Sequence, residues 1–155
     1  MIKKIVCVLA GLSFTVAVCA ADAFTGTWKM DVAKSTFAKG REVKELTSVV
    51  VEQGDSAVVT VKGTAGDGKP IAVTYTVPLK GGPISYTEGG PPAGVSVMSR
   101  RVNPTTIDST SMMNGKEIGS THTTISADSK TLTLVRKGAD ARGMSVDGTE
   151  IYHRQ

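Results

Sequence analysis

The sequence predicts an all-β fold, an antiparallel up-and-down β-barrel of about eight to ten strands with at most a short helix after the first strand. Apolar and polar residues alternate with period two along most of the chain, as in half-buried strands. Short turns separate these runs, and no sustained helical spacing of apolar residues occurs. The 18 threonines after residue 21 also suit a pleated, half-exposed surface, because their side chains are β-branched.

The first 21 residues have the order of a secretory signal peptide: two lysines, an apolar run and then Cys19-Ala20-Ala21. The apolar run is shorter than the about 20 residues that a bilayer-spanning helix needs. We expect cleavage after Ala21, with Ala20 as the alternative, and export to the periplasm or the medium. The bulky Val18 before Cys19 argues against a lipoprotein anchor at that cysteine.

Removal of residues 1–21 would leave a single domain over residues 22–155. Both cysteines, Cys7 and Cys19, would be lost, so the exported domain would depend on its core rather than on disulfides. Its net charge would be +2, from sixteen basic and fourteen acidic residues. No block of basic residues occurs, so we expect no nucleic-acid partner, and we expect no membrane span in the mature chain.

The first predicted strand contains Gly26-Thr27-Trp28, and only residues 31–39 after it have room for a helical turn or two. The later runs show the alternation most clearly in residues 71–77, where the large apolar side chains occupy every second position. The predicted strands after the first cover residues 45–52, 57–61, 71–77, 95–102, 105–113, 117–126, 131–137 and 144–153.

The turns between these runs are short, as at Gly54-Asp55 and Asn103-Pro104. Asn114-Gly115 is the strongest turn signal, because a type I′ turn needs two positive φ angles. Short turns make consecutive strands antiparallel neighbours. A long meander of this kind leaves two exposed edges unless the sheet closes, which favours a barrel.

The loop of residues 63–69 has the spacing G-x-x-x-x-G-K of a phosphate-binding loop. The following residue in that motif is Ser or Thr, and the loop opens a helix. Here Pro70 follows, and the loop leads into a strand. We therefore expect no nucleotide to bind.

No combination of residues predicts catalysis. His122 and His153 are the only histidines, and their spacing does not form a metal site. The stretch around Ser96 lacks the second glycine of a nucleophile elbow. The scattered aspartates stand beside turn residues, where they cap local backbone. The sequence thus predicts no catalytic residue, no metal and no cofactor, and an enzyme stays open as an alternative.

Phe24-x-Gly26-Thr27-Trp28 resembles the start of the calycins, the lipocalin-like and fatty-acid-binding-like barrels, in which a G-x-W motif lies on the first strand. The layout is also similar to that of small exported bacterial proteins with the same GTWK start. The resemblance implies that Trp28 closes one end of the barrel and packs against a late basic side chain, either Arg136 or Arg154. Gly26 would allow another segment to approach closely.

Residues 149–155 are similar to the last strand of the fatty-acid-binding branch, in which an Arg-x-Tyr pair holds a carboxylate. Here Glu150-Ile151-Tyr152 stands at that place, so an acid replaces the cation of a charge-assisted clamp. The helix pair that covers those barrels also has no counterpart. An exported lipocalin-like barrel is therefore the closer comparison.

Three functions follow as hypotheses. The first is a barrel that binds a small apolar or amphipathic ligand in its interior. The second is a barrel with a filled interior that binds a protein or envelope component through its surface, and the third is an enzyme. A cavity in the interior would favour the ligand-binding barrel. An exposed apolar patch over a filled interior would favour the surface-binding barrel. A pocket that holds a histidine beside a carboxylate would favour the enzyme. The residues expected to line the interior are Tyr75, Val97, Met112 and Met144, with His122 and Tyr152 as further candidates.

Overall fold

The alternating runs form strands throughout residues 22–155, the part of the chain that the computed structural model describes. The expected signal peptide and its cleavage sites lie outside these residues. The eleven strands are β1 (Gly26–Met30), β2 (Val43–Gln53), β3 (Ser56–Ala65), β4 (Pro70–Pro78), β5 (Gly82–Pro83), β6 (Ser85–Glu88), β7 (Val95–Asn103), β8 (Thr106–Met113), β9 (Lys116–Ile125), β10 (Thr131–Gly138) and β11 (Gly148–Arg154).

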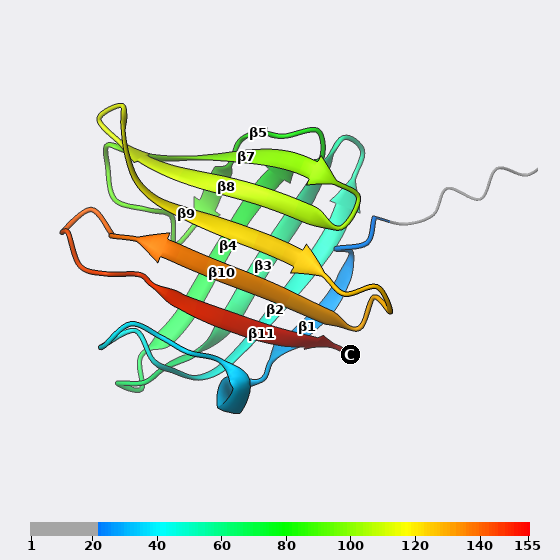
Figure 1. Cartoon of the computed structure of the whole chain (residues 1–155), viewed down its shortest axis with the longest axis horizontal. Helices are drawn as coiled ribbons and strands as arrows, with labels where there is room; N and C mark the ends of the chain where they lie inside the picture. Colours follow the sequence, from blue (N-terminus) through cyan, green and yellow to red (C-terminus); the bar gives the residue numbers. More distant parts are fainter. Residues whose placement is uncertain (1–21) are drawn as a thin grey trace, which may run out of the picture.

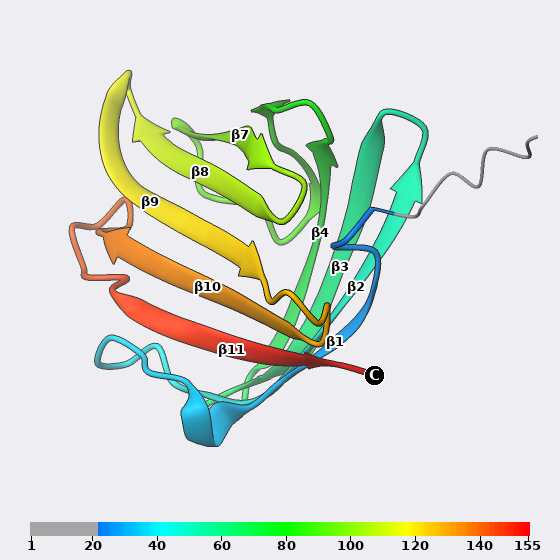
Figure 2. The same cartoon turned by 45° about the vertical axis from the view of Figure 1, so that its right-hand side comes forward.

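All eleven strands belong to one antiparallel sheet with the order β5-β7-β8-β9-β10-β11-β1-β2-β3-β4-β6. Strands β8 to β11 form the front wall in Figure 1, and β1 to β4 cross behind them. The chain closes the wall by pairing β11 with β1, where Arg154 lies opposite Trp28. The two edge strands, β5 and β6, are consecutive in the chain, so one short segment spans the seam between β7 and β4 (Figure 2).

The predicted fold class is confirmed: the described chain is an all-β, up-and-down, nearly closed barrel. The two strands that the sequence did not predict are β5 and β6, which are too short to show alternation. The expected helical segment is a single 3₁₀ turn, η1 (Val32–Lys34), whose N-terminus is capped by Asp31. Within residues 22–155, no helix has the length and apolar character required to cross a bilayer.

The last strand begins later than the sequence predicts, at Gly148 rather than at Met144. The reason is a loop over residues 139–147 that is organised by Asp140. Its carboxylate accepts hydrogen bonds from the backbone N–H groups of Arg142, at 2.8 Å, and Met144, at 3.0 Å. The alternating residues at 144–147 therefore belong to a loop and not to a strand.

Each long strand runs between two ends of the barrel. The end that we call the Trp28 end carries residues 22–25, the C-terminus and the turns at 54–55, 104–105 and 126–130. The opposite end, which we call the mouth, carries residues 35–42 and the loops at 89–94 and 139–147. The buried apolar residues are Phe24, Trp28, Met30, Leu46, Val50, Ala57, Val59, Ile125, Leu132 and Tyr152.

Candidate functional site

Trp28 anchors one end of the barrel. Its side chain is completely buried, and its Nε1 donates a hydrogen bond to the carbonyl oxygen of Phe24 at 2.8 Å. The guanidinium of Arg154 lies over the indole, 4.1 Å from the ring centroid, which is a cation–π contact. Of the two arginines that the sequence left open for this place, Arg154 occupies it.

Gly26 makes this contact possible. Its φ angle is +137°, and a Cβ atom at this position would lie 2.5 Å from Nη1 of Arg154. A side chain here would therefore be strained and would also displace the guanidinium. The glycine of the G-x-W motif thus provides the space in which the arginine reaches the tryptophan.

The N–H groups of Arg154 donate hydrogen bonds to backbone carbonyls at the Trp28 end. Its Nε donates to the carbonyl of Ser129 at 2.7 Å, and its Nη2 donates to the carbonyl of Ala23, also at 2.7 Å. The Nη1 group donates to the carbonyl of Thr25. Two of these carbonyls belong to the segment before β1 and the third to the turn between β9 and β10, so Arg154 ties the last strand to both.

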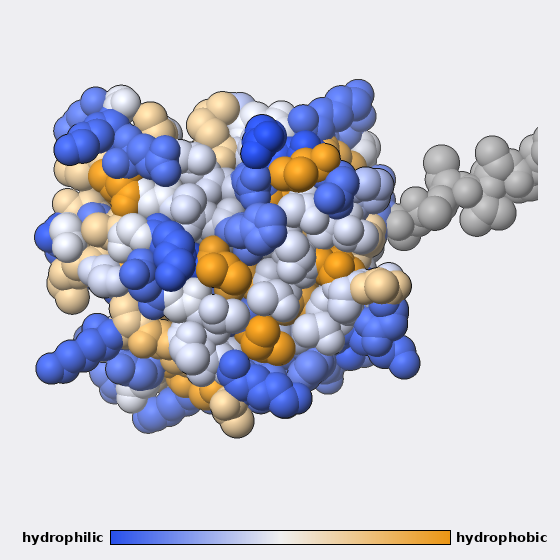
Figure 3. Space-filling model, viewed as in Figure 1, coloured by the Kyte–Doolittle hydropathy of each residue, from blue (hydrophilic) through white to orange (hydrophobic). Residues whose placement is uncertain are grey.

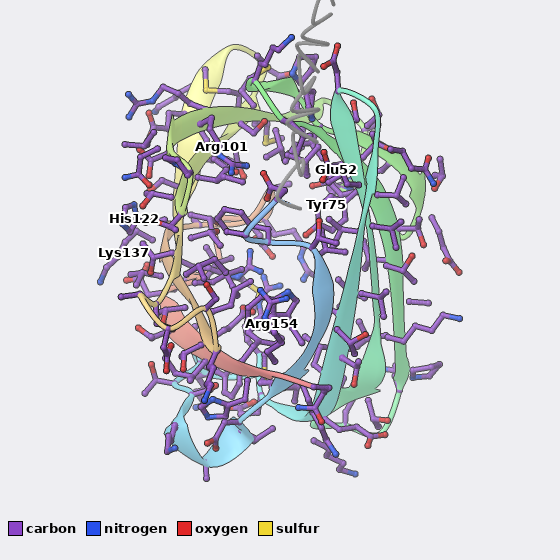
Figure 4. All side chains as sticks on the ribbon, turned by 90° about the vertical axis from the view of Figure 1, so that its right-hand side faces the viewer. Glu52, Tyr75, Arg101, His122, Lys137 and Arg154 are labelled. Carbon is purple, nitrogen blue, oxygen red and sulfur yellow. The ribbon has the colours of Figure 1, made fainter. Side chains whose placement is uncertain are left out.

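A second arginine strengthens the same end. Arg101 lies over the ring of Phe24, with its Cζ 5.1 Å from the centroid, and it forms an ion pair of 2.7 Å with Asp22. Figure 4 shows the molecule from this end, with Arg101 and Arg154 within the barrel wall. Two cations and two aromatic rings therefore meet at the Trp28 end.

The interior between the two ends is hollow. A cavity of about 400 Å³ occupies the barrel toward the Trp28 end, and a second one of about 360 Å³ lies at the mouth. Sites for small molecules commonly measure about 300–1,000 Å³. The two cavities adjoin, because they share the lining residues Leu46, Tyr86, Val97, Ser111, Thr121, Arg136 and Glu150.

A polar cluster lies where the two cavities meet. Arg136 of β10 follows Leu132 and Leu134 at every second position, so all three face inward. In the register of β10 with β11, Leu134 lies opposite Glu150, which brings this acid beside the arginine. Nε of Arg136 donates to Glu150 at 2.6 Å, and the hydroxyl of Tyr152 donates to the other carboxylate oxygen at 2.8 Å.

Arg136 and Glu150 differ in their exposure. The side chain of Glu150 is 12% exposed and that of Arg136 is 41% exposed. Because Arg136 points inward and lines both cavities, its exposed surface faces the lumen. Among residues 22–155, only its Nε has a hydrogen-bond partner, so both Nη groups are available to a ligand.

Two tyrosines complete the cluster. The rings of Tyr75 and Tyr86 are 5.5 Å apart, and both line the larger cavity. Burial raises the pKa of Tyr75 to about 12, with the charge of Arg136 opposing this effect in part. Burial and then the Glu150 carboxylate raise the pKa of Tyr152. The tyrosine hydroxyls are therefore neutral donors at physiological pH.

The guanidinium of Arg136 stays protonated. Burial alone lowers the pKa of its guanidinium, but the neighbouring carboxylate of Glu150 outweighs burial, and the pKa lies above its usual value. The cluster therefore contains a permanent cation that is neutralised by one acid. Its free Nη groups can donate to acceptor atoms of a bound molecule.

Two loops approach each other over the mouth. Residues 36–41 and 139–148 both contribute to the smaller cavity, and Arg41 of the first forms an ion pair with Asp140 of the second. Burial raises the pKa of Asp140, but hydrogen bonds from the N–H groups of Met144 and Arg142 and from Arg41 outweigh it and lower the pKa to about 2. We call this ion pair of Arg41 and Asp140 the latch, because it joins the two loops.

Only some of the ligand-binding residues that were predicted from the sequence line the two cavities. Tyr75, Val97 and Tyr152 line the larger cavity. Met112 and Met144 line neither cavity, because Met112 lies opposite the outward Ser96 and Met144 lies in the loop after β10. The expected methionine wall is therefore not part of the lumen.

His122 also lies outside both cavities. It is on the outer side of the wall (Figure 4), with a side chain that is 55% exposed. Its Nδ1 is 2.6 Å from Asp108, whose other oxygen accepts from Arg100 at 2.7 Å. A histidine beside a carboxylate is therefore present, but on the outer surface and not in a pocket.

Sequence reasoning missed the cluster of Arg136 and Glu150. It treated Arg136 as a possible partner of Trp28, and it treated Glu150 as an unpaired acid in the place of a cation. The alternation of Leu132, Leu134 and Arg136 was the available signal, since it places the arginine on the apolar face of its strand.

Neither family models nor curated proteins match this chain. Among solved structures, EF1p2_mFAP2b bound to DFHBI is similar with a TM-score of 0.51 and 15% sequence identity, covering 88% of this chain and 97% of that one. The redesigned β-barrel mFAP1 bound to DFHBI has a TM-score of 0.46 and 13% identity, covering 85% and 95%. The first likeness supports the fold of this chain and extends no further.

Proposed function

We propose that this chain is an exported lipocalin-like barrel that binds one small, mostly apolar molecule in its lumen. The observation that carries the proposal is the pair of adjoining cavities, of about 400 and 360 Å³. Protein interiors are normally close-packed, and atoms that line a void lose favourable contacts. A bound molecule of suitable shape would restore these contacts.

The chemistry of the lining supports an apolar ligand. Most side chains that face the larger cavity are aliphatic, and burial of apolar surface contributes about 25 cal/mol per Å² to binding. A barrel of similar fold, EF1p2_mFAP2b, is described as bound to DFHBI, which is in line with binding by a barrel of this shape. The aliphatic lining includes Val59, Val61, Ile71, Val73, Ile107 and Leu134.

The calycin assignment is part of this proposal. It is supported by the Gly26-x-Trp28 motif and by the late arginine, Arg154, over the indole. Export is supported by the signal-like order of residues 1–21. N-terminal sequencing of the protein from its own source should find Asp22 or Ala21 as the first residue. Retention of Met1 would refute export by this route.

The alternative functions receive less support. A barrel that acts only through its surface was expected to have a filled interior, and the lumen is hollow. On the face shown in Figure 3, the apolar residues form separate spots rather than one continuous patch. An enzyme would need reactive groups in a pocket, and His122 lies outside both cavities.

Binding in the lumen can be tested with the neutral apolar fluorophore N-phenyl-1-naphthylamine. Val97 lines both cavities, so Val97→Trp should fill the lumen and lower the affinity roughly tenfold or more, a loss of about 1.4 kcal/mol or more. The matched control is Met98→Trp, since Met98 is the next residue of β7 and is 44% exposed. Equal affinities of the two variants, or no binding by the unmodified protein, would refute the proposal.

A further inference from the structure

We infer that the lumen selects an uncharged ligand that carries a hydrogen-bond acceptor, such as a carbonyl oxygen, and that it discriminates against carboxylates. The inference rests on the proposed lumen binding and specifies its ligand class. It follows from two properties of the polar cluster: the donors that it leaves free, and the charge that it has already neutralised.

The free donors converge on one region of the cavity. Both Nη groups of Arg136 lack a protein partner within the described chain, and the hydroxyl of Tyr75 has none there either. Tyr75 is close enough to sense the charges of both Arg136 and Glu150. A ligand that fills the lumen displaces water from these donors, and a donor that loses water without gaining a new partner is unfavourable. A ligand oxygen that accepts from them avoids this penalty, whereas a pure hydrocarbon incurs it.

The charges around the lumen oppose a negative ligand. The arginines that line the cavities are Arg41, Arg101 and Arg136, and each is paired with an acid. Asp147 at the mouth is a further acid in the lining, so the lining contains three arginines and four acids. No excess of positive charge remains to attract an anion.

Glu150 has the strongest effect, because it is on the Arg136 guanidinium itself. A carboxylate ligand that approached the free Nη groups would bring a second negative charge close to Glu150, in a lumen from which the ligand itself has displaced water. Juxtaposed like charges at an interface are strongly unfavourable. A ketone or amide oxygen accepts the same hydrogen bonds and carries no net charge, so it avoids this repulsion.

The test uses two probes with the same ring system. One is 6-propionyl-2-(dimethylamino)naphthalene, a neutral ketone, and the other is 6-(dimethylamino)-2-naphthoic acid, a carboxylate at pH 7. Titration of the unmodified protein should show that the ketone binds at least roughly tenfold more tightly than the carboxylate.

The decisive variant is Glu150→Gln, which keeps the shape of the side chain and its acceptor for Tyr152 but removes the charge. It should raise the affinity for the carboxylate at least roughly tenfold, because the Arg136 cation is then free to clamp it, and it should change the affinity for the ketone far less. The control is Glu117→Gln, which removes the same charge from an exposed position on β9 and should change neither affinity.

The outcomes separate this inference from the proposed function. If neither probe binds the unmodified protein, and N-phenyl-1-naphthylamine does not bind either, lumen binding itself is wrong. If the apolar fluorophore binds and the carboxylate binds as tightly as the ketone, the lumen is a binding site but the selection described here is refuted. A response of Glu150→Gln equal to that of Glu117→Gln would refute it as well.

Discussion

Two arginines on the inner side of the barrel show how differently its two regions use the same side chain. At the Trp28 end, Arg154 lies on the indole, and its donors are directed at three backbone carbonyls. In the lumen, Arg136 is held through Nε alone and exposes its other nitrogens to a cavity. The first arginine is a part of the framework, and the second is available for recognition.

Under the proposed function, the donors of Arg154 are used within the framework, whereas the free Nη donors of Arg136 are the ones that would contact a ligand. Both guanidiniums come from the last two long strands, and both lie near aromatic side chains. A variant at the Trp28 end should therefore reduce stability and spare ligand selection, while a variant in the cluster should do the reverse. The following predictions test this contrast, from the largest expected effect to the smallest.

The largest effect is expected for Trp28→Ala. Trp28 is completely buried, and loss of a buried aromatic side chain costs about 3–5 kcal/mol. Urea unfolding of the variant, followed by circular dichroism, should show this loss in the free energy of unfolding. Trp28 is the single tryptophan, so its fluorescence in the unmodified protein should be that of a buried indole. An unchanged melting temperature would contradict a structural role for this end.

A smaller loss is expected for Gly26→Ala. The new methyl group would approach Nη1 of Arg154 to 2.5 Å on a backbone with a φ angle of +137°. Strained backbone conformations of this kind cost about 1–3 kcal/mol. The matched control is Gly40→Ala, because Gly40 also has a positive φ, of +79°, but nothing lies within 4 Å of its added methyl. The stability loss at Gly26 should exceed the loss at Gly40, and equal losses would remove the steric part of this explanation.

The cluster should behave in the opposite way. In the double variant Arg136→Met with Glu150→Gln, both charges disappear together, so no unpaired charge is left in the lumen. Replacement of a buried ion pair by less polar groups is often neutral for stability or favourable. We expect a change in unfolding free energy within about 1 kcal/mol, together with weaker binding of the ketone probe, because the Nη donors of Arg136 are gone. A severe loss of stability would make this pair structural and would erase the contrast with Arg154.

The smallest effect concerns the latch at the mouth and depends on pH. The pKa of Asp140 is lowered to about 2 from an ordinary value of 3.8, so its contribution to stability is complete above pH 4 and is lost as the pH falls toward 2. Unfolding experiments between pH 5 and pH 2 should show the unmodified protein converging with Asp140→Asn. The comparison with this variant is necessary because the pKa values of Asp31, Asp67, Asp108 and Asp128 are also lowered. A constant difference across this range would show that Asp140 makes no pH-dependent contribution.

The sequence was informative about local structure. Period-two alternation predicted the long strands, and the resemblance of the Gly26-x-Trp28 start to the calycins implied a buried indole under Arg136 or Arg154, of which Arg154 occupies the place. The seam strands β5 and β6 could not be predicted in this way, since Gly82–Pro83 and Ser85–Glu88 are too short for a pattern. Their pairing is a consequence of how the sheet closes.

The lumen was harder to predict because it depends on register between strands. In the sequence alone, Glu150 is an acid without an identifiable partner, because its neighbours on the adjacent strand are unknown. The pairing of Leu134 with Glu150 brings Arg136 to the acid, and no spacing within one strand shows this. Met144 lies outside both cavities for a different reason, since its N–H group donates to Asp140 and its segment is a loop.

The two ends of the described chain have a practical consequence for how the barrel can be held. Asp22 forms an ion pair with Arg101, and the N–H group of Gln155 donates to the carbonyl of Thr27 at 2.9 Å, so residues 22 and 155 both lie at the Trp28 end. A tag, a fused domain or an anchoring surface that is joined next to residue 22 or residue 155 would hold the molecule by this end. The mouth would then point away from the attachment, and immobilised protein would keep its lumen accessible from solution.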